Sequence, residues 1–262
     1  MTTPGSEVLE ERTGSPFLRV TINRPDKRNA LTEAMLDQLE QGFRRADEDP
    51  DVRVVVLRGA GNDSFCAGAD LQTMTGGSFL DTHEARGRFP KLFLRILECT
   101  KPTIAAVNGH CVAGGLGLML SCDLAIAKSG FKMGTPEIKR GLFPFMISAL
   151  ILRTVSRRDA AEMMLLGETF TTEDAERLGL VNRVVGPELF DATVEEWAGK
   201  LASLSPAVLR LGKKAMLTQE GMSLRAAFDH LQGLITINAM LEDAEEGVRA
   251  FFEKRPPIFR GR

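Results

Sequence analysis

The chain lacks long apolar runs and any surplus of charge of one sign, and both absences exclude classes of protein. Its 262 residues are 44% hydrophobic and 26% charged, with a net charge of −2. No run of about 18 apolar residues occurs, so the sequence predicts no membrane-spanning helix. The near-neutral charge argues against a nucleic-acid surface that depends on bulk positive charge. We therefore expect a packed core, with neither a membrane nor a nucleic acid as partner.

Cysteine is also scarce, and its spacing is not that of a metal site. Cys66, Cys99, Cys111 and Cys122 are scattered singly, so we predict reduced, mostly buried thiols and no metal centre. The first twelve residues are polar and acidic and lack the basic and apolar regions of a signal peptide. A cytoplasmic location is the resulting expectation.

Strand and helix patterns alternate over the first half of the chain, and helices dominate from Met146 onward. Residues 17–22 alternate like a half-buried strand, whereas residues 52–57 are apolar enough to be covered on both faces. Thr32 is suited to cap a helix that runs to about residue 47. A helix is expected over residues 81–98, interrupted or bent at Pro90. The order predicts an α/β fold followed by an all-helical segment.

The stretch from Thr103 to Glu137 concentrates the features that suggest chemistry. An apolar strand over residues 103–107 is followed by Asn108-Gly109, a pair that tolerates positive φ. Ala113-Gly114-Gly115-Leu116-Gly117 then opens a helix whose first N–H groups are free to hold negative charge. Gly134-Thr135-Pro136-Glu137 forms a second turn that presents one carboxylate. Free N–H groups can stabilise an oxyanion, and a carboxylate can move a proton.

Several motifs in the same order make the chain similar to the crotonase family, the enoyl-CoA hydratases and isomerases. Besides the stretch just described, they are Asn23-Arg24-Pro25, Asn29-Ala30-Leu31, Ser64-Phe65-Cys66-Ala67-Gly68-Ala69-Asp70-Leu71, Ala175-Glu176-Arg177-Leu178-Gly179-Leu180-Val181 and Phe252-Glu253-Lys254-Arg255. The resemblance covers nearly the whole chain. It implies a crotonase-like spiral of ββα units with the acyl-CoA site over residues 1–200. It also implies a C-terminal helical trimerisation segment over residues 201–262, and a homotrimer or a dimer of trimers.

The resemblance also implies which residues do the chemistry. The backbone N–H groups of Ala69 and Gly114 would hold the thioester oxygen, and Glu137 would be the acid and base. Two-acid relatives carry a further carboxylate where this chain has Gly117. Because a 1,3 proton shift needs only one carboxylate, double-bond isomerisation is slightly favoured over hydration. Hydration by Glu137 alone and other enolate chemistry, such as decarboxylation or hydrolysis, remain open alternatives.

Coenzyme A would enter as part of the acyl-CoA substrate, and no separate cofactor is expected. The lysine near the C-terminus would meet the CoA phosphates, often from a neighbouring subunit. The implied CoA-contacting residues are Arg28, Ala30, Ala67, Ala69, Asp70, Leu71, Gly114, Pro136 and Lys254.

Three other sequence features also bear on the site. Residues 141–148 are bulky and apolar, which would raise the pKa of Glu137, although Met146 and Ile147 are expected in the core. His110 is expected to be structural, and Asp123 to orient or cap a strand. Two other classes stay open. A nucleotide-binding dehydrogenase is disfavoured because the third glycine of its fingerprint falls on Leu120. A non-catalytic acyl-CoA-binding protein would not need Glu137.

Overall fold

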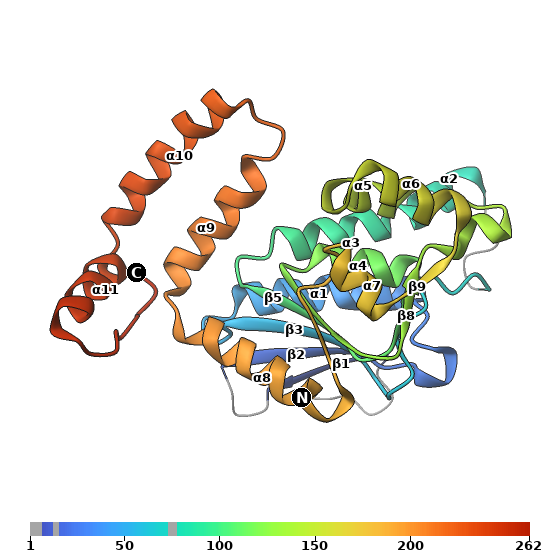
Figure 1. The fold of residues 1–262 in the computed structure, drawn as a ribbon, viewed down its shortest axis with the longest axis horizontal. Coiled ribbons are helices and arrows are strands. Elements are labelled where there is room, and N and C mark those ends of the chain that lie inside the picture. Colours follow the sequence, from blue (N-terminus) through green and yellow to red (C-terminus); the bar gives the residue numbers. More distant parts are fainter. Residues whose placement is uncertain (1–6, 13–15, 73–77) are drawn as a thin grey trace.

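Two mainly parallel sheets are built from strands that alternate along the chain. The computed structural model describes residues 7–12, 16–72 and 78–262. The larger sheet has the order β1-β2-β3-β5-β7-β10 and the smaller one β4-β6-β8-β9, with β1 and β9 antiparallel to their neighbours (Figure 1). The strands are β1 (Val8–Arg12), β2 (Phe17–Ile22), β3 (Val54–Gly59), β4 (Ser64–Cys66), β5 (Thr103–Val107), β6 (His110–Val112), β7 (Leu124–Lys128), β8 (Lys132–Gly134), β9 (Thr169–Thr171) and β10 (Arg183–Val185).

The helices follow pairs of strands, so the unit that repeats is ββα. In β3-β4, β5-β6 and β7-β8 the first strand joins the larger sheet and the second joins the smaller one. This is the spiral that the resemblance implies. The helices are η1 (Pro25–Lys27), α1 (Glu33–Glu48), α2 (Phe79–Arg86), α3 (Arg88–Leu97), α4 (Gly114–Ser121), η2 (Pro136–Arg140), α5 (Phe145–Thr154), α6 (Arg157–Leu166), α7 (Thr172–Arg177), α8 (Pro187–Ser203), α9 (Pro206–Thr218), α10 (Leu224–Ala239) and α11 (Glu242–Glu253).

Strand β3 lies at the centre of the larger sheet and is covered on both faces, as the apolar run over residues 52–57 predicts. Val55 and Leu57 point into the main core beneath α1, α3 and α4. Val54 and Val56 point the other way, into a second core that includes Phe190 of α8. Period-two alternation between two cores explains why every position of the strand centre is apolar.

The helix predicted over residues 81–98 is interrupted just before Pro90, which is one of the two alternatives predicted there. Ser78 begins α2 with a capping box to Asp81. Helix α2 ends at Arg86, and α3 starts at Arg88, so Pro90 lies in the first turn of α3. A proline is tolerated there because the N–H it lacks would have no intrahelical partner. The break lies on the N-terminal side of Pro90, where the proline ring would clash with the carbonyl of Arg86 in a continuous helix, so Pro90 accounts for it.

Neither β1 nor the strands of the smaller sheet were predicted from the sequence. All four strands of the smaller sheet have three residues each, too few for an alternating pattern to be visible. The turn at Asn108-Gly109 also differs from expectation, since neither residue has a positive φ. Gly109 is needed for close approach, because a Cβ there would overlap the backbone N of Ser64. The buried Asn108 amide bonds to both backbone groups of Gly59 and joins the ends of β3 and β5.

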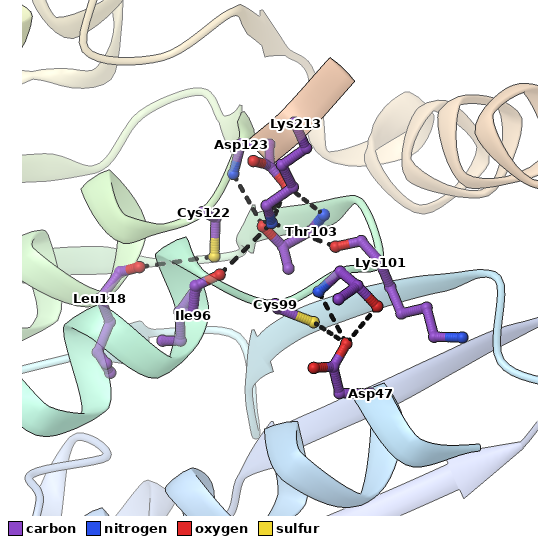
Figure 2. Close-up of polar contacts among 10 residues, drawn as sticks. Asp47, Ile96, Cys99, Lys101, Thr103, Leu118, Cys122, Asp123 and Lys213 are labelled. Carbon is purple, nitrogen blue, oxygen red and sulfur yellow. Dashed lines mark hydrogen bonds and ion pairs between the residues drawn. The ribbon is translucent and has the colours of Figure 1, made fainter. Parts of the chain in front are cut away.

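The helices α9, α10 and α11 form an arm that extends away from the two sheets (Figure 1). Its anchor on the core is Lys213 of α9, which donates to the carboxylate of Asp123 at 2.7 Å and to the carbonyl of Lys101 at 3.2 Å (Figure 2). Asp123 also accepts from the backbone and hydroxyl of Thr103, which confirms that it orients the start of β5. The described residues contain no helix long and apolar enough to cross a membrane.

The cysteines are free and mostly buried, as predicted. Burial raises the pKa of the Cys66 thiol to about 12 and that of Cys99 to about 11. Thiols held in the neutral form at these sites are poor nucleophiles, so they belong to the core and not to the chemistry.

Candidate active site

Glu137 lies on η2, just after β8, and its carboxyl group is half withdrawn from water. Its Oε2 is the one buried side-chain polar atom in residues 7–12, 16–72 and 78–262 that lacks a hydrogen-bond partner. Burial raises the pKa of Glu137, against smaller lowering effects from its own backbone and from Arg140. A carboxylate with one unpartnered oxygen and a raised pKa is matched to taking a proton from a bound molecule.

The segments that carry Ala69 and Gly114 touch each other. Gly68 has φ +87°, and a Cβ there would lie 2.8 Å from the backbone N of Gly114. Leu31 donates to the Gly68 carbonyl and accepts from the Asp70 N–H, which leaves the Ala69 N–H outside this pairing. Gly114 is the first residue of α4, so its N–H has no partner within the helix. The segments that carry these two N–H groups therefore lie side by side, and neither N–H is used in the pairings just described.

Ala113 orients the start of α4 in a backbone conformation that alanine rarely adopts. Its φ is 51° and its ψ is −130°. Such a conformation costs about 1–3 kcal/mol and persists only where the surrounding structure fixes it. Here it is fixed by the Ala113 N–H, which donates to the carbonyl of Gly134, and by the contact with Gly68.

We expect Ala113→Gly to raise the free energy of unfolding by about 1 kcal/mol, because relief of the strain outweighs the added backbone entropy of glycine. Urea denaturation of the two proteins measures the difference. Ala125→Gly is the matched control, since Ala125 is buried in β7 without a positive φ, and this variant should be less stable. Equal destabilisation by both substitutions would contradict strain at Ala113.

Two phenylalanines of α3 close the space beside the glycines of α4. A Cβ at Gly114 would lie 2.6 Å from Cε1 of Phe89. A Cβ at Gly117 would overlap Cζ of Phe93 and lie 3.0 Å from both of its Cε atoms. Position 117, where the resemblance would place a second carboxylate, is thus packed against a buried aromatic ring. No sequence pattern links Phe93 to Gly117, so this contact could not be predicted.

The residues predicted to contact CoA near the N-terminus form one surface. Ala67 donates to the carbonyl of Arg28 at 3.1 Å. Arg24 holds the two segments together, since it donates to the Ala30 carbonyl at 3.3 Å and to the Asp70 carboxylate at 2.7 Å. The Arg24 guanidinium is the main reason that the pKa of Asp70 is lowered. Arg24 belongs to one of the motifs that carry the resemblance but is not among the predicted site residues, although its ion pair joins the two segments of this surface.

Some of the other residues singled out from the sequence lie beside Glu137 or Asp70, and others lie elsewhere. Pro136 begins η2 directly before Glu137, and Leu71 is 49% exposed at the edge of the same surface as Asp70. Lys254 is different, because it is the C-cap residue of α11, and Figure 1 shows α11 well apart from β8, the strand that precedes Glu137. Ile147 is buried as expected, but Met146 is 47% exposed, because it lies on the outer side of α5. The exposed His110 accepts from the Lys132 N–H at 3.1 Å, which gives it a structural contact, as expected.

Comparison with known proteins shows to which family the chain is related. The family model for enoyl-CoA hydratase/isomerase matches residues 12–262. The chain is 38% identical to a putative enoyl-CoA hydratase of Thermus thermophilus, over 92% of this chain and 96% of the relative. It is 36% identical to the 2,3-dehydroadipyl-CoA hydratase of Escherichia coli, over 98% of this chain and all of the relative.

Solved structures show the same likeness in three dimensions. An enoyl-CoA hydratase of Mycobacterium smegmatis superposes with a TM-score of 0.93 and 35% identity, over 97% of this chain and 99% of that one. An enoyl-CoA hydratase of Bacillus anthracis superposes with a TM-score of 0.94 and 28% identity, over 98% of this chain and 100% of that one. The crotonase-like fold is therefore confirmed, and the chain belongs to the enoyl-CoA hydratase/isomerase family.

Proposed function

We propose that this family member forms an enolate from an enoyl-CoA thioester, with Glu137 as its single acid and base. The observation that carries the proposal is the buried, unpartnered Oε2 of Glu137. A structural glutamate at this depth would be expected to have a hydrogen-bond donor, because leaving a buried polar group unsatisfied costs about 1–3 kcal/mol. Substrate is the partner that would satisfy it.

In the proposed reaction Glu137 takes a proton from C2 of a 3-enoyl-CoA. The electron pair of the broken C–H bond moves toward the thioester carbonyl, whose oxygen becomes negative. The N–H groups of Ala69 and Gly114 donate to that oxygen, and losing one such donor typically costs about 3 kcal/mol of barrier. Glu137 then returns the same proton at C4, which leaves the double bond between C2 and C3. Protons and electrons balance without a second acid.

We favour this isomerisation over hydration because residue 117 is a glycine, so it supplies no second carboxylate, and Phe93 fills the space beside it. Adding water usually divides acid and base work between two groups, and a carboxylate at position 117 would have no room. The second candidate is hydration by Glu137 alone. It is favoured by the names of the relatives, two of which are a 2,3-dehydroadipyl-CoA hydratase and a (E)-benzylidenesuccinyl-CoA hydratase.

The discriminating experiment gives the enzyme a 3-enoyl-CoA and, separately, the matching 2-enoyl-CoA. Isomerisation predicts rapid double-bond migration in the first and slow water addition to the second, with products identified by mass spectrometry. Fast hydration with no migration would make the second candidate correct. Binding of both thioesters without turnover of either would indicate a non-catalytic acyl-CoA-binding protein.

We further propose a cytoplasmic homotrimer, or a dimer of trimers, in which the arm contacts neighbouring subunits. Support comes from the many large apolar side chains that the arm exposes in the monomer. Those above 60% exposure are Met216, Leu224, Phe228, Ile235, Met240, Phe251, Phe252 and Ile258. In such an assembly Lys254 of one copy would meet the CoA phosphates bound to another.

Lys254→Ala should raise the KM for acyl-CoA about tenfold, the loss of about 1.4 kcal/mol expected for one charge-assisted hydrogen bond. Activity on truncated pantetheine thioesters should not change, because they lack the phosphates that the lysine would hold. Lys200→Ala is the control, since that exposed lysine pairs with Glu196 on its own helix. A similar loss on both kinds of substrate would mean that Lys254 does not contact phosphate.

A further inference from the structure

Two aromatic rings on α3 pack against two glycines on α4 in the same way, yet they differ in exposure. Phe89 and Phe93 are one helical turn apart, with ring centroids 5.8 Å apart and planes tilted by 57°. Each points at a glycine, Phe89 at Gly114 and Phe93 at Gly117. Phe93 is 4% exposed and lies within the main core, whereas Phe89 is only partly buried. Of the two rings, Phe89 is therefore the one that a ligand can touch.

The position of Phe89 relates it to one part of the substrate. Its ring packs on the Cα of Gly114, whose N–H is the proposed donor to the thioester oxygen. The carbonyl carbon that bears this oxygen is bonded directly to C2, so the first carbons of the acyl chain lie near this N–H. We infer that Phe89 is a specificity-determining residue that forms a wall beside C2 and selects acyl chains that are unbranched there. The inference rests on the proposed function.

The Phe89 ring is held rigidly, so it can discriminate between acyl chains with and without a branch at C2. A phenylalanine side chain has two rotatable bonds, and here the ring is held by Gly114 on one side and by Phe93 on another. It cannot shift toward Gly114 without overlapping backbone, because the two are already in contact. A methyl group on C2 would therefore meet a surface that does not yield. One methyl group in an apolar pocket changes selectivity by about 10- to 200-fold.

The test compares binding of two saturated thioesters, butyryl-CoA and its 2-methyl-branched analogue, by calorimetry. Neither can undergo the reaction, so the measurement does not depend on which chemistry the enzyme performs. We expect wild type to bind the straight chain at least about tenfold more tightly than the branched one. Phe89→Leu should reduce this preference at least about fivefold by admitting the branch.

Phe93→Leu is the matched control, because it removes the same group one turn along the same helix but opens space beside Gly117. It should lower stability and change the chain preference much less than Phe89→Leu does, because the ring of Phe89 stays in place although it loses its contact with Phe93. Phe89→Met replaces the rigid ring by a flexible side chain that keeps most of its volume, so it tests whether the rigidity of Phe89 matters even if Phe89→Leu folds poorly. An unchanged preference in the Phe89 variants, or an equal change in Phe93→Leu, would overturn the inference. Failure of wild type to bind either thioester would instead overturn the proposed function.

Discussion

Glu137→Gln should lower turnover by about 10²–10⁴, the usual contribution of a general acid or base. The amide keeps the shape of the carboxyl group but cannot take a proton. Binding of a saturated acyl-CoA should change little, because the N–H groups of Ala69 and Gly114 and the surface around Asp70 remain. Single-turnover kinetics measures the first effect and calorimetry the second, so chemistry is separated from binding.

Glu168→Gln is the control for this substitution. Glu168 is an exposed glutamate that pairs with Lys139 of η2 at 2.7 Å, so it lies close to Glu137 in the fold but faces water. Its loss should leave turnover unchanged. If Glu137→Gln kept a nearly normal rate, the proton would have to move to another group, and the single-base mechanism would be wrong.

The raised pKa of Glu137 also predicts the pH dependence of the wild-type rate and the stability of the Glu137→Gln variant. A general base must be ionised, so kcat/KM should fall with decreasing pH at a value above the ordinary glutamate pKa of 4.5. Because the folded state binds the proton more tightly than the unfolded chain, stability decreases as the pH rises from the unfolded to the folded pKa. Glu137→Gln removes this cost. The variant should therefore be more stable than wild type at neutral pH while being much less active.

The parts of the site that could be predicted are those that depend on local chain geometry. Gly114 at a helix start and Glu137 after a turn need only a few neighbouring residues to be recognised. The central strands were also predictable, because burial on both faces requires an apolar residue at every position. The ion pair of Arg24 and Asp70 joins residues 46 apart, and nothing local in the sequence indicates it.

The absence of a local signal in the sequence also explains which structural features were not predicted. A three-residue strand is held by its neighbours in the sheet and not by its own pattern, so β4, β6, β8 and β9 left no clear signal. The break between α2 and α3 is indicated by Pro90, but no pattern in the sequence places it at Gly87. Met146 is hydrophobic like a core residue, yet it lies at the surface. The residue type gives its hydrophobicity, whereas its exposure depends on which face of α5 packs against the core.

Gly117→Glu is expected to fold poorly unless Phe93 is changed with it. Replacing a helical glycine gains up to about 1 kcal/mol in propensity. Against this, the new Cβ overlaps the ring of Phe93, which lies in the main core. A carboxylate buried without a partner costs several kcal/mol more. The single substitution should therefore lower the free energy of unfolding by at least about 3 kcal/mol.

Phe93→Ala makes room for the new side chain, so the double variant should recover part of that loss. Phe93→Ala alone should cost about 3–5 kcal/mol, because it leaves a cavity. A double-mutant cycle measured by urea denaturation gives the coupling, which we expect to favour the double variant by at least about 1 kcal/mol. Gly117→Ala is the control for the backbone, since it adds the Cβ without the charge. A Gly117→Glu protein as stable as wild type would show that the ring moves aside freely.

The product ratio of the double variant tests whether position 117 governs the chemistry. With space available, a carboxylate there could share acid and base work with Glu137 and hold the water that adds to C3. Hydration of a short 2-enoyl-CoA should then rise relative to double-bond migration in a 3-enoyl-CoA, whereas Phe93→Ala alone should leave this ratio unchanged. If the ratio rose equally in both variants, access of water past the missing ring would be the cause. A folded double variant with an unchanged ratio would place residue 117 away from the reacting carbons, and the preference for isomerisation would then have to rest on Glu137 alone.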